Sequence, residues 1–291
     1  MLSIIIPSYN SKETILNLLK SIEENTQKLP EYEVIMVDSS DDGTEKLVEK
    51  NYKKVKIIKL KEKTPAPIAR NIGIKNSKYN FFLFIDSDCE LVLSEKLNLE
   101  EFKDRISGGF VYPANFNSGV SISQYLLEFI DFNPYQREGK RNFVPSCIML
   151  TPRRIETTEI YFPESLDYKL SEDIAICNLM HKKGIKIFFT KKFGVRHKNR
   201  EDFQDFKKHI SKLGYHSGRT RKTLNIKGGF LKKIPIFACL LIPYRFTKIL
   251  LKLIKYSFKD KIFLKGFCHL HVLLYFLSIW CFNFYKGLKD A

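Results

Sequence analysis

The chain has 291 residues, 44% of them hydrophobic, which suits one large domain or one domain with an appendage. Its net charge of +17 is uneven: residues 1–181 hold 23 Lys and Arg against 27 Asp and Glu, whereas residues 182–291 hold 26 against 5. A basic half of this kind indicates a nucleic acid or an anionic membrane surface as partner. None of the six cysteines forms a C-x-x-C pair, which argues against zinc and redox motifs and favours an intracellular, reducing setting. The N-terminus has no basic lead-in, so a signal peptide is not expected.

The first 90 residues alternate short apolar runs with helical patterns. Four of the runs predict buried strands: 3–7, 32–38, 54–60 and 80–86. Helices are predicted after Ser11, after Thr44 and over residues 66–77, with Ser11 and Thr44 as the expected caps. Strands that alternate with helices predict right-handed βαβ units, hence an α/β fold with a Rossmann-like, mostly parallel sheet flanked by helices.

The middle of the chain is less regular. Residues 142–150 predict a further strand, and an acidic pair, Glu172 and Asp173, precedes a helical pattern that ends at Gly184. Residues 185–190 then predict another strand.

The C-terminal tail changes character after two glycines at 228 and 229. Residues 245–259 predict a basic amphipathic helix whose apolar face suits the membrane interface, and that face consists of Phe246, Ile249, Leu250, Leu253 and Ile254. Residues 266–285 contain no Asp, Glu, Lys or Arg and are just long enough to span a bilayer. We therefore expect a domain over 1–228, followed by a helical, membrane-associated region over 229–291.

Polar residues follow three of the predicted strands, at Pro7–Asn10, Asp38 and Asp86–Asp88. In open parallel sheets the carboxyl ends of the strands share one edge, and ligands bind there. Two carboxylates that flank one residue suit a hard divalent cation such as Mg²⁺ or Mn²⁺ together with substrate phosphates. A D-x-D triplet alone favours a solvated turn, but its position at the ligand-binding edge together with Asp38 favours a metal site.

The acidic pair at residues 172 and 173 allows two interpretations. Acidic residues at a helix start are favoured by the helix dipole without any catalytic role. Near a metal site, one of the carboxylates could instead accept the proton of an attacking hydroxyl group.

Four segments, in this order, resemble the family 2 glycosyltransferases, which have the nucleotide-sugar-binding GT-A fold. The segments are "SIIIPSYNSKETILNLLKSI", "VIMVDSSDDGT", "ARNIGIKNSKYNFFLFIDSD" and "SEDIAICNLMHKKGIKI". The resemblance covers about residues 1–215 and implies inverting transfer of a sugar from a nucleotide-diphosphate sugar to a hydroxyl acceptor.

The resemblance also implies roles for individual residues. Four residues would border the nucleoside pocket: Pro7, Tyr9, Asn10 and Asp38, the last accepting a hydrogen bond from the base. Arg70 would approach the diphosphate or the base, and Asp86 and Asp88 would form the D-x-D that binds Mg²⁺ or Mn²⁺. Asp173 would be the general base, with Glu172 beside it.

Other segments match the family less closely. In "VRHKNR" the resemblance implies a metal- or phosphate-contacting histidine at His197, whereas an exposed basic loop is the other interpretation. The segment "PSCIML" stands where many family members have a glycine-rich strand start, so Pro145 and Ser146 depart from the pattern. Asp42 is expected to form a turn rather than to bind a ligand.

Three alternatives remain. Nucleic-acid binding is disfavoured, because the basic residues alternate with aliphatic and aromatic runs and no nucleic-acid module is present. A nucleotidyltransferase would carry a glycine-rich basic loop near its N-terminus, and a non-catalytic sugar-nucleotide binder would not need the acids at 86, 88 and 173. We expect a glycan or lipid-linked acceptor and a location on the cytoplasmic face of a membrane, peripheral or anchored through the tail, because lysines meet anionic headgroups while apolar faces enter the bilayer.

Overall fold

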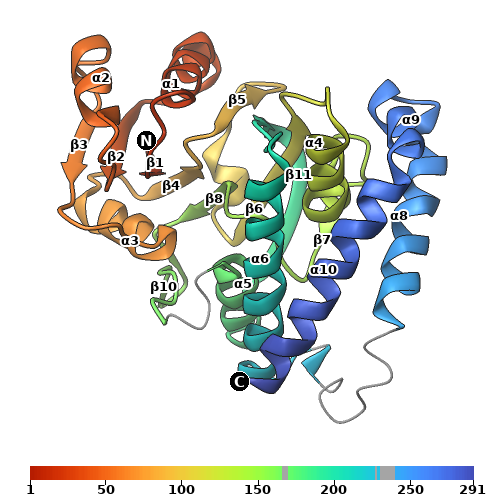
Figure 1. Ribbon diagram of the computed structural model, residues 1–291. Helices are drawn as coiled ribbons and strands as arrows, with labels where there is room; N and C mark the ends of the chain where they lie inside the picture. Colours follow the sequence, from red (N-terminus) through yellow and green to blue (C-terminus); the bar gives the residue numbers. More distant parts are fainter. Residues whose placement is uncertain (166–169, 227, 230–239) are drawn as a thin grey trace. The chain divides into compact units, whose positions relative to one another are not determined.

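The structure is a computed structural model that describes residues 1–165, 170–226, 228–229 and 240–291 of the chain (Figure 1). It divides into two compact units. Unit 1 comprises Met1–Tyr112, Arg137–Glu164 and Glu172–Lys198, and unit 2 comprises Pro113–Gln136, Ser165–Ser171 and Asn199–Ala291. Residues 199–228, which the sequence-based boundary assigns to the N-terminal domain, thus fall in the same unit as the C-terminal helices.

The N-terminal half of the sheet in unit 1 is parallel, as the sequence predicts. Its strands lie in the order β3-β2-β1-β4, with the bounds β1 (Leu2–Ser8), β2 (Tyr32–Asp38), β3 (Lys56–Lys59) and β4 (Phe81–Ile85). The connecting helices are α1 (Ile15–Glu24), α2 (Thr44–Asn51) and α3 (Ala66–Asn76). The register pairs Ser8 with Asp38, so the carboxyl ends of β1 and β2 lie side by side.

The other half of the sheet is antiparallel, so the expectation of a mostly parallel sheet does not extend beyond β4. The further strands are β5 (Cys89–Leu93), β6 (Arg105–Pro113), β7 (Gly139–Lys140), β8 (Ile148–Pro152) and β11 (Lys186–His197). The pairs β4–β8, β6–β8, β5–β11 and β7–β11 are antiparallel, and β6 also lies beside β11 in the sheet. A two-stranded sheet of β9 (Arg154–Ile155) and β10 (Thr158–Glu159) and the helix α5 (Glu172–Lys182) complete the elements.

Helix α3 packs very closely on β1. A Cβ atom built on Gly73 would lie only 2.4 Å from Cγ2 of Ile5, which is fully buried. Residues three apart share one face of a helix, so Arg70 also lies on the side of α3 that faces the sheet, and it is 1% exposed. The close approach at Gly73 therefore positions the guanidinium group described below.

The two predicted helix caps take different roles. Helix α1 begins at Ile15, with Thr14 as its N-cap, and the Ser11 carbonyl accepts hydrogen bonds from the amides of Thr14 and Ile15. Thr44 is the first residue of α2 rather than its cap. The Asp42 carboxylate accepts hydrogen bonds from the amide and the hydroxyl group of Thr44. Burial alone would raise the pKa of Asp42, but these hydrogen bonds outweigh it and lower that pKa. Asp42 is thus a turn former, as predicted.

Unit 2 is mainly helical. Its helices are α4 (Gly119–Gln124), α6 (Phe203–Thr223), α8 (Leu241–Ser257), α9 (Lys261–Cys268) and α10 (Leu270–Lys289), and a π-helical turn (Tyr125–Phe129) follows α4. Helices α6 and α10 lie along one another (Figure 1). Their backbones touch, because a Cβ atom on Gly218 would lie 2.1 Å from the carbonyl oxygen of Phe284. The Trp280 and Phe284 rings of α10 stack in the core of this unit, with centroids 4.8 Å apart.

No single helix among the described residues is both long and apolar enough to cross a membrane. Helices α9 and α10 meet the two criteria only as a pair, and they are bent by 80° at the break between them.

We expect Gly218→Ala to lower the free energy of unfolding by about 1–3 kcal/mol, as overpacking of a core does. The backbone carbonyl opposite cannot move aside cheaply, so this cost outweighs the gain of roughly 1 kcal/mol in helix propensity. Urea denaturation followed by circular dichroism measures the change. Lys212→Ala, at an exposed position of the same helix, is the control and should change little. A Gly218→Ala protein as stable as the wild type would contradict the close helix contact.

Candidate active site

The loops that follow β1, β2 and β4 are joined by hydrogen bonds, so the three polar clusters predicted from the sequence do come together in unit 1. The Asn10 amide donates to the Ser40 hydroxyl at 2.8 Å, and the Asn10 side-chain oxygen accepts from the Asp41 amide at 3.1 Å. The Ser11 and Ser87 hydroxyl groups lie 2.6 Å apart. Asn10 has a positive φ of 52°, a conformation that asparagine tolerates better than most residues. Ser87, the middle residue of the D-x-D, is thus attached to the loop after β1.

Asp38 is fully buried at the end of β2. Its Oδ1 accepts a hydrogen bond from Ser40, and its Oδ2 accepts one from the Lys59 ammonium group at 3.0 Å. Lys59 also forms an ion pair with Glu45 at 3.1 Å. Burial alone would lower the pKa of Lys59, but hydrogen bonds to the two acids outweigh it and raise that pKa. Both carboxylate oxygens of Asp38 thus already accept hydrogen bonds, from Ser40 and Lys59, which the sequence did not predict.

The other nucleoside-pocket candidates differ in exposure. Pro7 is buried within β1, whereas Tyr9 is 39% exposed. The Lys63 ammonium group lies 3.8 Å from the centroid of the Tyr9 ring, a cation–π contact. At this edge of the sheet, Tyr9 thus provides an aromatic ring and Lys63 provides a positive charge.

The centre of the site is a buried arginine that bridges two acids. One terminal nitrogen of Arg70 donates to Asp86 Oδ1 at 2.6 Å, and the other donates to Glu172 Oε1 at 2.8 Å. The Ser146 hydroxyl also donates to that Glu172 oxygen, at 3.0 Å. The Phe162 ring, 5.1 Å from the guanidinium carbon, packs on Arg70. The predicted contact of Arg70 with a diphosphate or base stays a prediction, and the structure adds this bridge to it.

The charges of the bridge depend on one another. Burial alone would lower the pKa of Arg70, but Asp86 and Glu172 outweigh it and raise that pKa, so the guanidinium stays charged. Burial raises the pKa of Asp86, and the Arg70 charge opposes this shift. An uncompensated charge is costly to bury, so each of the three groups needs the others.

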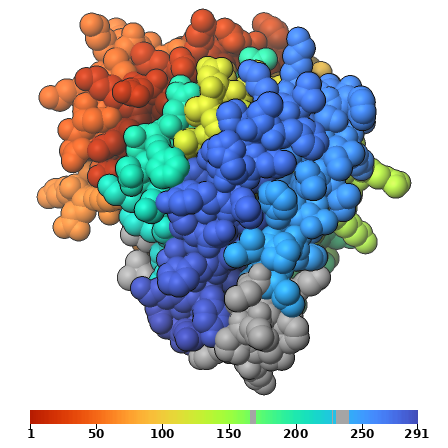
Figure 2. All heavy atoms as spheres, turned by 45° about the vertical axis from the view of Figure 1, so that its right-hand side comes forward, coloured from red at the N-terminus to blue at the C-terminus, as the bar shows by residue number. Residues whose placement is uncertain are grey.

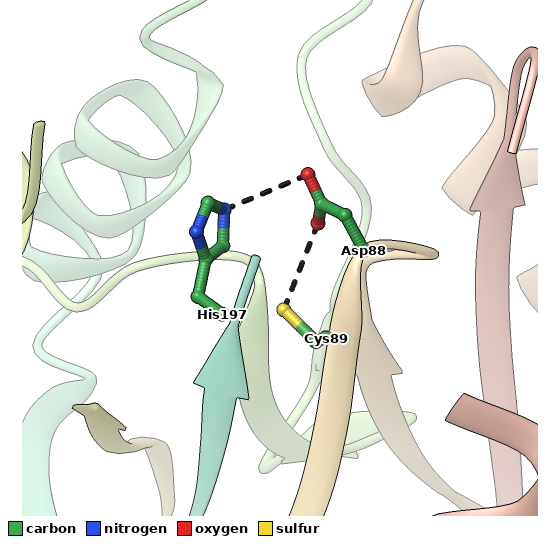
Figure 3. A group of neighbouring side chains, drawn as sticks. All are labelled: Asp88, Cys89 and His197. Carbon is green, nitrogen blue, oxygen red and sulfur yellow. Dashed lines mark hydrogen bonds and ion pairs between the residues drawn. The ribbon is translucent and has the colours of Figure 1, made fainter. Parts of the chain in front are cut away.

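A second cluster combines Asp88, Cys89 and His197 (Figure 3). His197 ends β11 and lies directly opposite Cys89 in the antiparallel pair with β5. Its Nε2 atom is 3.6 Å from Asp88 Oδ2, and the Cys89 sulfur is 3.8 Å from Asp88 Oδ1. The Lys198 amide donates to the Asp88 carbonyl at 2.8 Å, which fixes the turn against the end of β11. The structure therefore places the predicted histidine beside the D-x-D, and 5% of His197 is exposed.

The donor atoms of this cluster fit a divalent metal ion. One potential ligand atom from each of the three residues lies within 4.8 Å of the others. A carboxylate and an imidazole suit Mn²⁺ or a similar ion that also binds phosphates. Burial raises the pKa of the Cys89 thiol well above its usual range, and a thiol is in any case a soft ligand that Mn²⁺ and Mg²⁺ do not favour. Asp88 and His197 are therefore the fitting ligands, while one oxygen of Asp86 is held by Arg70.

The predicted base lies beside the arginine bridge. Glu172 and Asp173 form the first turn of α5, as the sequence predicts. The Asp173 Oδ1 atom accepts a hydrogen bond from the Ile174 amide at 2.7 Å. Glu172 is nearly buried and is held by Arg70 and Ser146, so its role in the structure is to anchor the start of α5. Ser146 was noted in the sequence only as a departure from the family pattern.

A hollow elsewhere in unit 1 does not belong to this site. It is lined by Asn80, Phe81, Lys103, Pro152, Arg153 and Arg154. Phe81 begins β4, so the hollow lies at the other end of this strand from Asp86. The Arg153 guanidinium already donates to carbonyl groups of Ser77 and Tyr79.

A parallel half-sheet with polar loops at its carboxyl ends, a D-x-D turn beside a histidine and an acidic helix start define the GT-A class of nucleotide-sugar-binding folds. Comparison with known proteins agrees. Residues 3–145 match the family model "Glycosyl transferase family 2", which identifies this part of the chain as a family 2 glycosyltransferase domain.

Among curated proteins, the chain is similar to poly(ribitol-phosphate) beta-N-acetylglucosaminyltransferase TarS of Staphylococcus aureus strain Mu50. The two are 36% identical over 189 residues, which cover 59% of this chain and 30% of TarS. The chain thus matches less than a third of the length of that relative.

Two solved structures share the fold. Mannosyltransferase PcManGT from Pyrobaculum calidifontis, in complex with GDP-Man and Mn²⁺, has a TM-score of 0.63 at 13% identity and covers 99% of this chain and 87% of its own. Residues 1–349 of S. aureus TarS in complex with UDP-GlcNAc have a TM-score of 0.50 at 20% identity, and the match covers 99% of this chain and 90% of the TarS chain. At these identities the likeness establishes the fold alone.

We expect Arg70→Met to lower the free energy of unfolding by about 3–5 kcal/mol, because it leaves two acids without their buried partner. Arg154→Met is the matched control. Arg154 forms a 2.7 Å ion pair with Glu159 in which both side chains are about half exposed, and such pairs contribute about 1 kcal/mol or less. Urea denaturation of both proteins measures the difference. Equal losses for the two substitutions would contradict the bridge.

Proposed function

We propose that the chain is an inverting glycosyltransferase that moves a sugar from a nucleotide-diphosphate sugar to a hydroxyl acceptor. The observation that carries this proposal is the Arg70 bridge. It ties Asp86 of the D-x-D to Glu172, the residue before the predicted base, although 86 positions separate the two acids in the sequence. A turn that suits a metal and phosphates and a helix start that offers a base are thus parts of one buried network.

The reaction needs one displacement and one proton transfer. The hydroxyl oxygen of the acceptor attacks the anomeric carbon from the face opposite the diphosphate, and the bond between this carbon and the diphosphate oxygen breaks. Asp173 accepts the hydroxyl proton. The configuration at the anomeric carbon inverts, and no covalent bond to the enzyme forms. Arg70 positions the start of α5 without contacting the reacting atoms.

On this proposal, the nucleotide lies at the carboxyl ends of β1 and β2. Tyr9 offers an aromatic face to the nucleoside, and Asp38 accepts from its base. Asp88 and His197, with Asp86 beside them, would hold the divalent metal. A bound Mn²⁺ or Mg²⁺ supplies charge neutralisation for the departing diphosphate.

The comparisons support a nucleotide-sugar donor and a glycan acceptor. PcManGT and TarS, which share the fold, were solved with GDP-Man and UDP-GlcNAc respectively, and the name of TarS gives poly(ribitol-phosphate) as its acceptor. We therefore infer a hydroxyl group of a glycan or of a lipid-linked glycan as the acceptor. A binding screen of UDP-, GDP- and dTDP-sugars with Mn²⁺ identifies the donor, and binding of none of them would sink the proposal.

We expect Asp173→Asn to bind the donor as the wild type does but to transfer sugar at least about a hundredfold more slowly, because a general base contributes at least that much. Calorimetry measures donor binding, and the release of nucleoside diphosphate in the presence of acceptor measures transfer. Asp104→Asn, at an exposed carboxylate that pairs with Lys186, is the control. Wild-type transfer by the Asp173→Asn protein would remove the proposed base. Release of pyrophosphate by the wild type would favour a nucleotidyltransferase. Donor binding without release of any nucleotide product would favour a non-catalytic sugar-nucleotide binder.

We expect Asp88→Asn and His197→Gln each to weaken Mn²⁺ binding by at least about tenfold, since even outer-shell substitutions cost that much. Electron paramagnetic resonance of free Mn²⁺ in the presence of nucleoside diphosphate measures binding without any catalytic turnover. Cys89→Ser should leave the affinity unchanged, because a thiol is a soft ligand that Mn²⁺ does not favour. Weaker binding in the Cys89→Ser protein would instead make the sulfur a ligand.

A further inference from the structure

The outer side of α8 in unit 2 carries a row of exposed apolar side chains. Tyr244, Leu251 and Phe258 follow one another at intervals of seven residues and are 56%, 61% and 95% exposed. Seven residues make nearly two turns of an α-helix, so the three side chains lie along one line. Ile254, which is 50% exposed, lies beside the row. Single exposed apolar residues are ordinary, but several that share one helix face, here with Lys248 and Lys255 spaced between them, mark an interaction surface.

Apart from Ile254, these side chains do not belong to the apolar face that the sequence pattern selects. Ile249 and Leu253, central residues of the predicted membrane-facing side, are 5% and 0% exposed. Leu253 packs on α9, where a Cβ atom on Gly266 would lie 2.7 Å from its Cδ2 atom. The prediction that these two residues enter a bilayer is therefore wrong, because unit 2 uses them for its own core.

Lysines surround the row. Five of them are exposed on α8, on α9 and in the turn between them: Lys248, Lys255, Lys259, Lys261 and Lys265. Residues 241–289 contain nine Lys and Arg and a single acid, Asp260. The Asp260 carboxylate has partners within unit 2, because it accepts hydrogen bonds from the Ile262 amide at 3.0 Å and from the Tyr135 hydroxyl at 2.9 Å. Figure 2 shows the surface of α8 to α10 in blue.

We propose that this surface, the α8 row of Tyr244, Leu251, Ile254 and Phe258 with Lys248, Lys255 and Lys259, docks on an anionic lipid bilayer. Such a bilayer satisfies both of its features. The lysines meet anionic headgroups, and the apolar side chains enter the boundary between headgroups and acyl chains. A second copy of this chain would bring lysines against lysines, and nucleic acid would leave Leu251 and Ile254 without an apolar partner.

The proposal goes beyond the transfer reaction and does not depend on it. Docking through α8 would hold the enzyme at the surface where a lipid-linked acceptor resides. Its test measures binding alone, so an inactive protein can still support it, and an active one can still contradict it.

We expect the full chain to sediment with phosphatidylcholine vesicles that contain phosphatidylglycerol, and not with vesicles of phosphatidylcholine alone. Lys248→Gln, Lys255→Gln and Lys259→Gln together should lower the partition coefficient about a hundredfold, at roughly fivefold for each lysine. The charge-matched control replaces three exposed lysines of unit 1, Lys50, Lys53 and Lys54, with glutamine. An equal loss in the control would show that net charge alone, and not the α8 row, causes binding.

The apolar part of the surface is tested separately. Phe258→Ser should weaken vesicle binding about tenfold, since an exposed phenylalanine gains at least that much on burial. Phe282→Ser, at a phenylalanine of α10 that is 71% exposed, is the matched control and should leave binding unchanged. Phe258→Trp gives a second readout, because the chain has one other tryptophan, the buried Trp280. We expect its fluorescence to shift to the blue on addition of anionic vesicles. Absence of the shift, or failure of the wild type to bind such vesicles, would overturn the proposal.

Discussion

The organisation of the site depends on one buried charge. Arg70 is 1% exposed, and a guanidinium group cannot be buried unless opposite charges and hydrogen-bond acceptors surround it. Asp86 and Glu172 meet that need, and in turn neither acid could lie so near the other without the arginine between them. The bridge therefore fixes the turn after β4 and the start of α5 relative to α3.

This constraint also divides the roles of the acids. Asp86 and Glu172 hold the arginine, so they are structural members of the site before any substrate arrives. Asp88 points to His197 instead (Figure 3). Asp173 follows the anchored Glu172 on α5. Four carboxylates that look alike in the sequence thus have different partners, and the partner of each determines whether it can bind a metal, accept a proton or only keep the site together.

The local pattern of the sequence predicts the parallel half of the sheet and its ligand-binding edge, because strand periodicity and strand ends are local properties. It does not predict the antiparallel half, where the pairing of β4 with β8 and of β5 with β11 joins distant segments. The same holds within the site. Arg70 and Glu172 are 102 residues apart in the sequence, and the local pattern around neither residue indicates that the two side chains meet. His197 was predicted from the family resemblance. Cys89, the third member of its cluster, has no sequence signal other than its position next to Asp88.

Helix α8 shows the limit of the pattern in another way. Hydrophobic periodicity identifies which residues share a face, but an apolar face can pack on lipid or on the protein's own core with the same spacing. Ile249 and Leu253 pack inward because α9 offers Gly266, whose lack of a side chain makes room for Leu253. The lysines and the heptad-spaced Tyr244, Leu251 and Phe258 are then left outside together. Folding thus buries the more regular apolar face of α8. The lysines of the C-terminal half are then exposed together with the remaining apolar side chains.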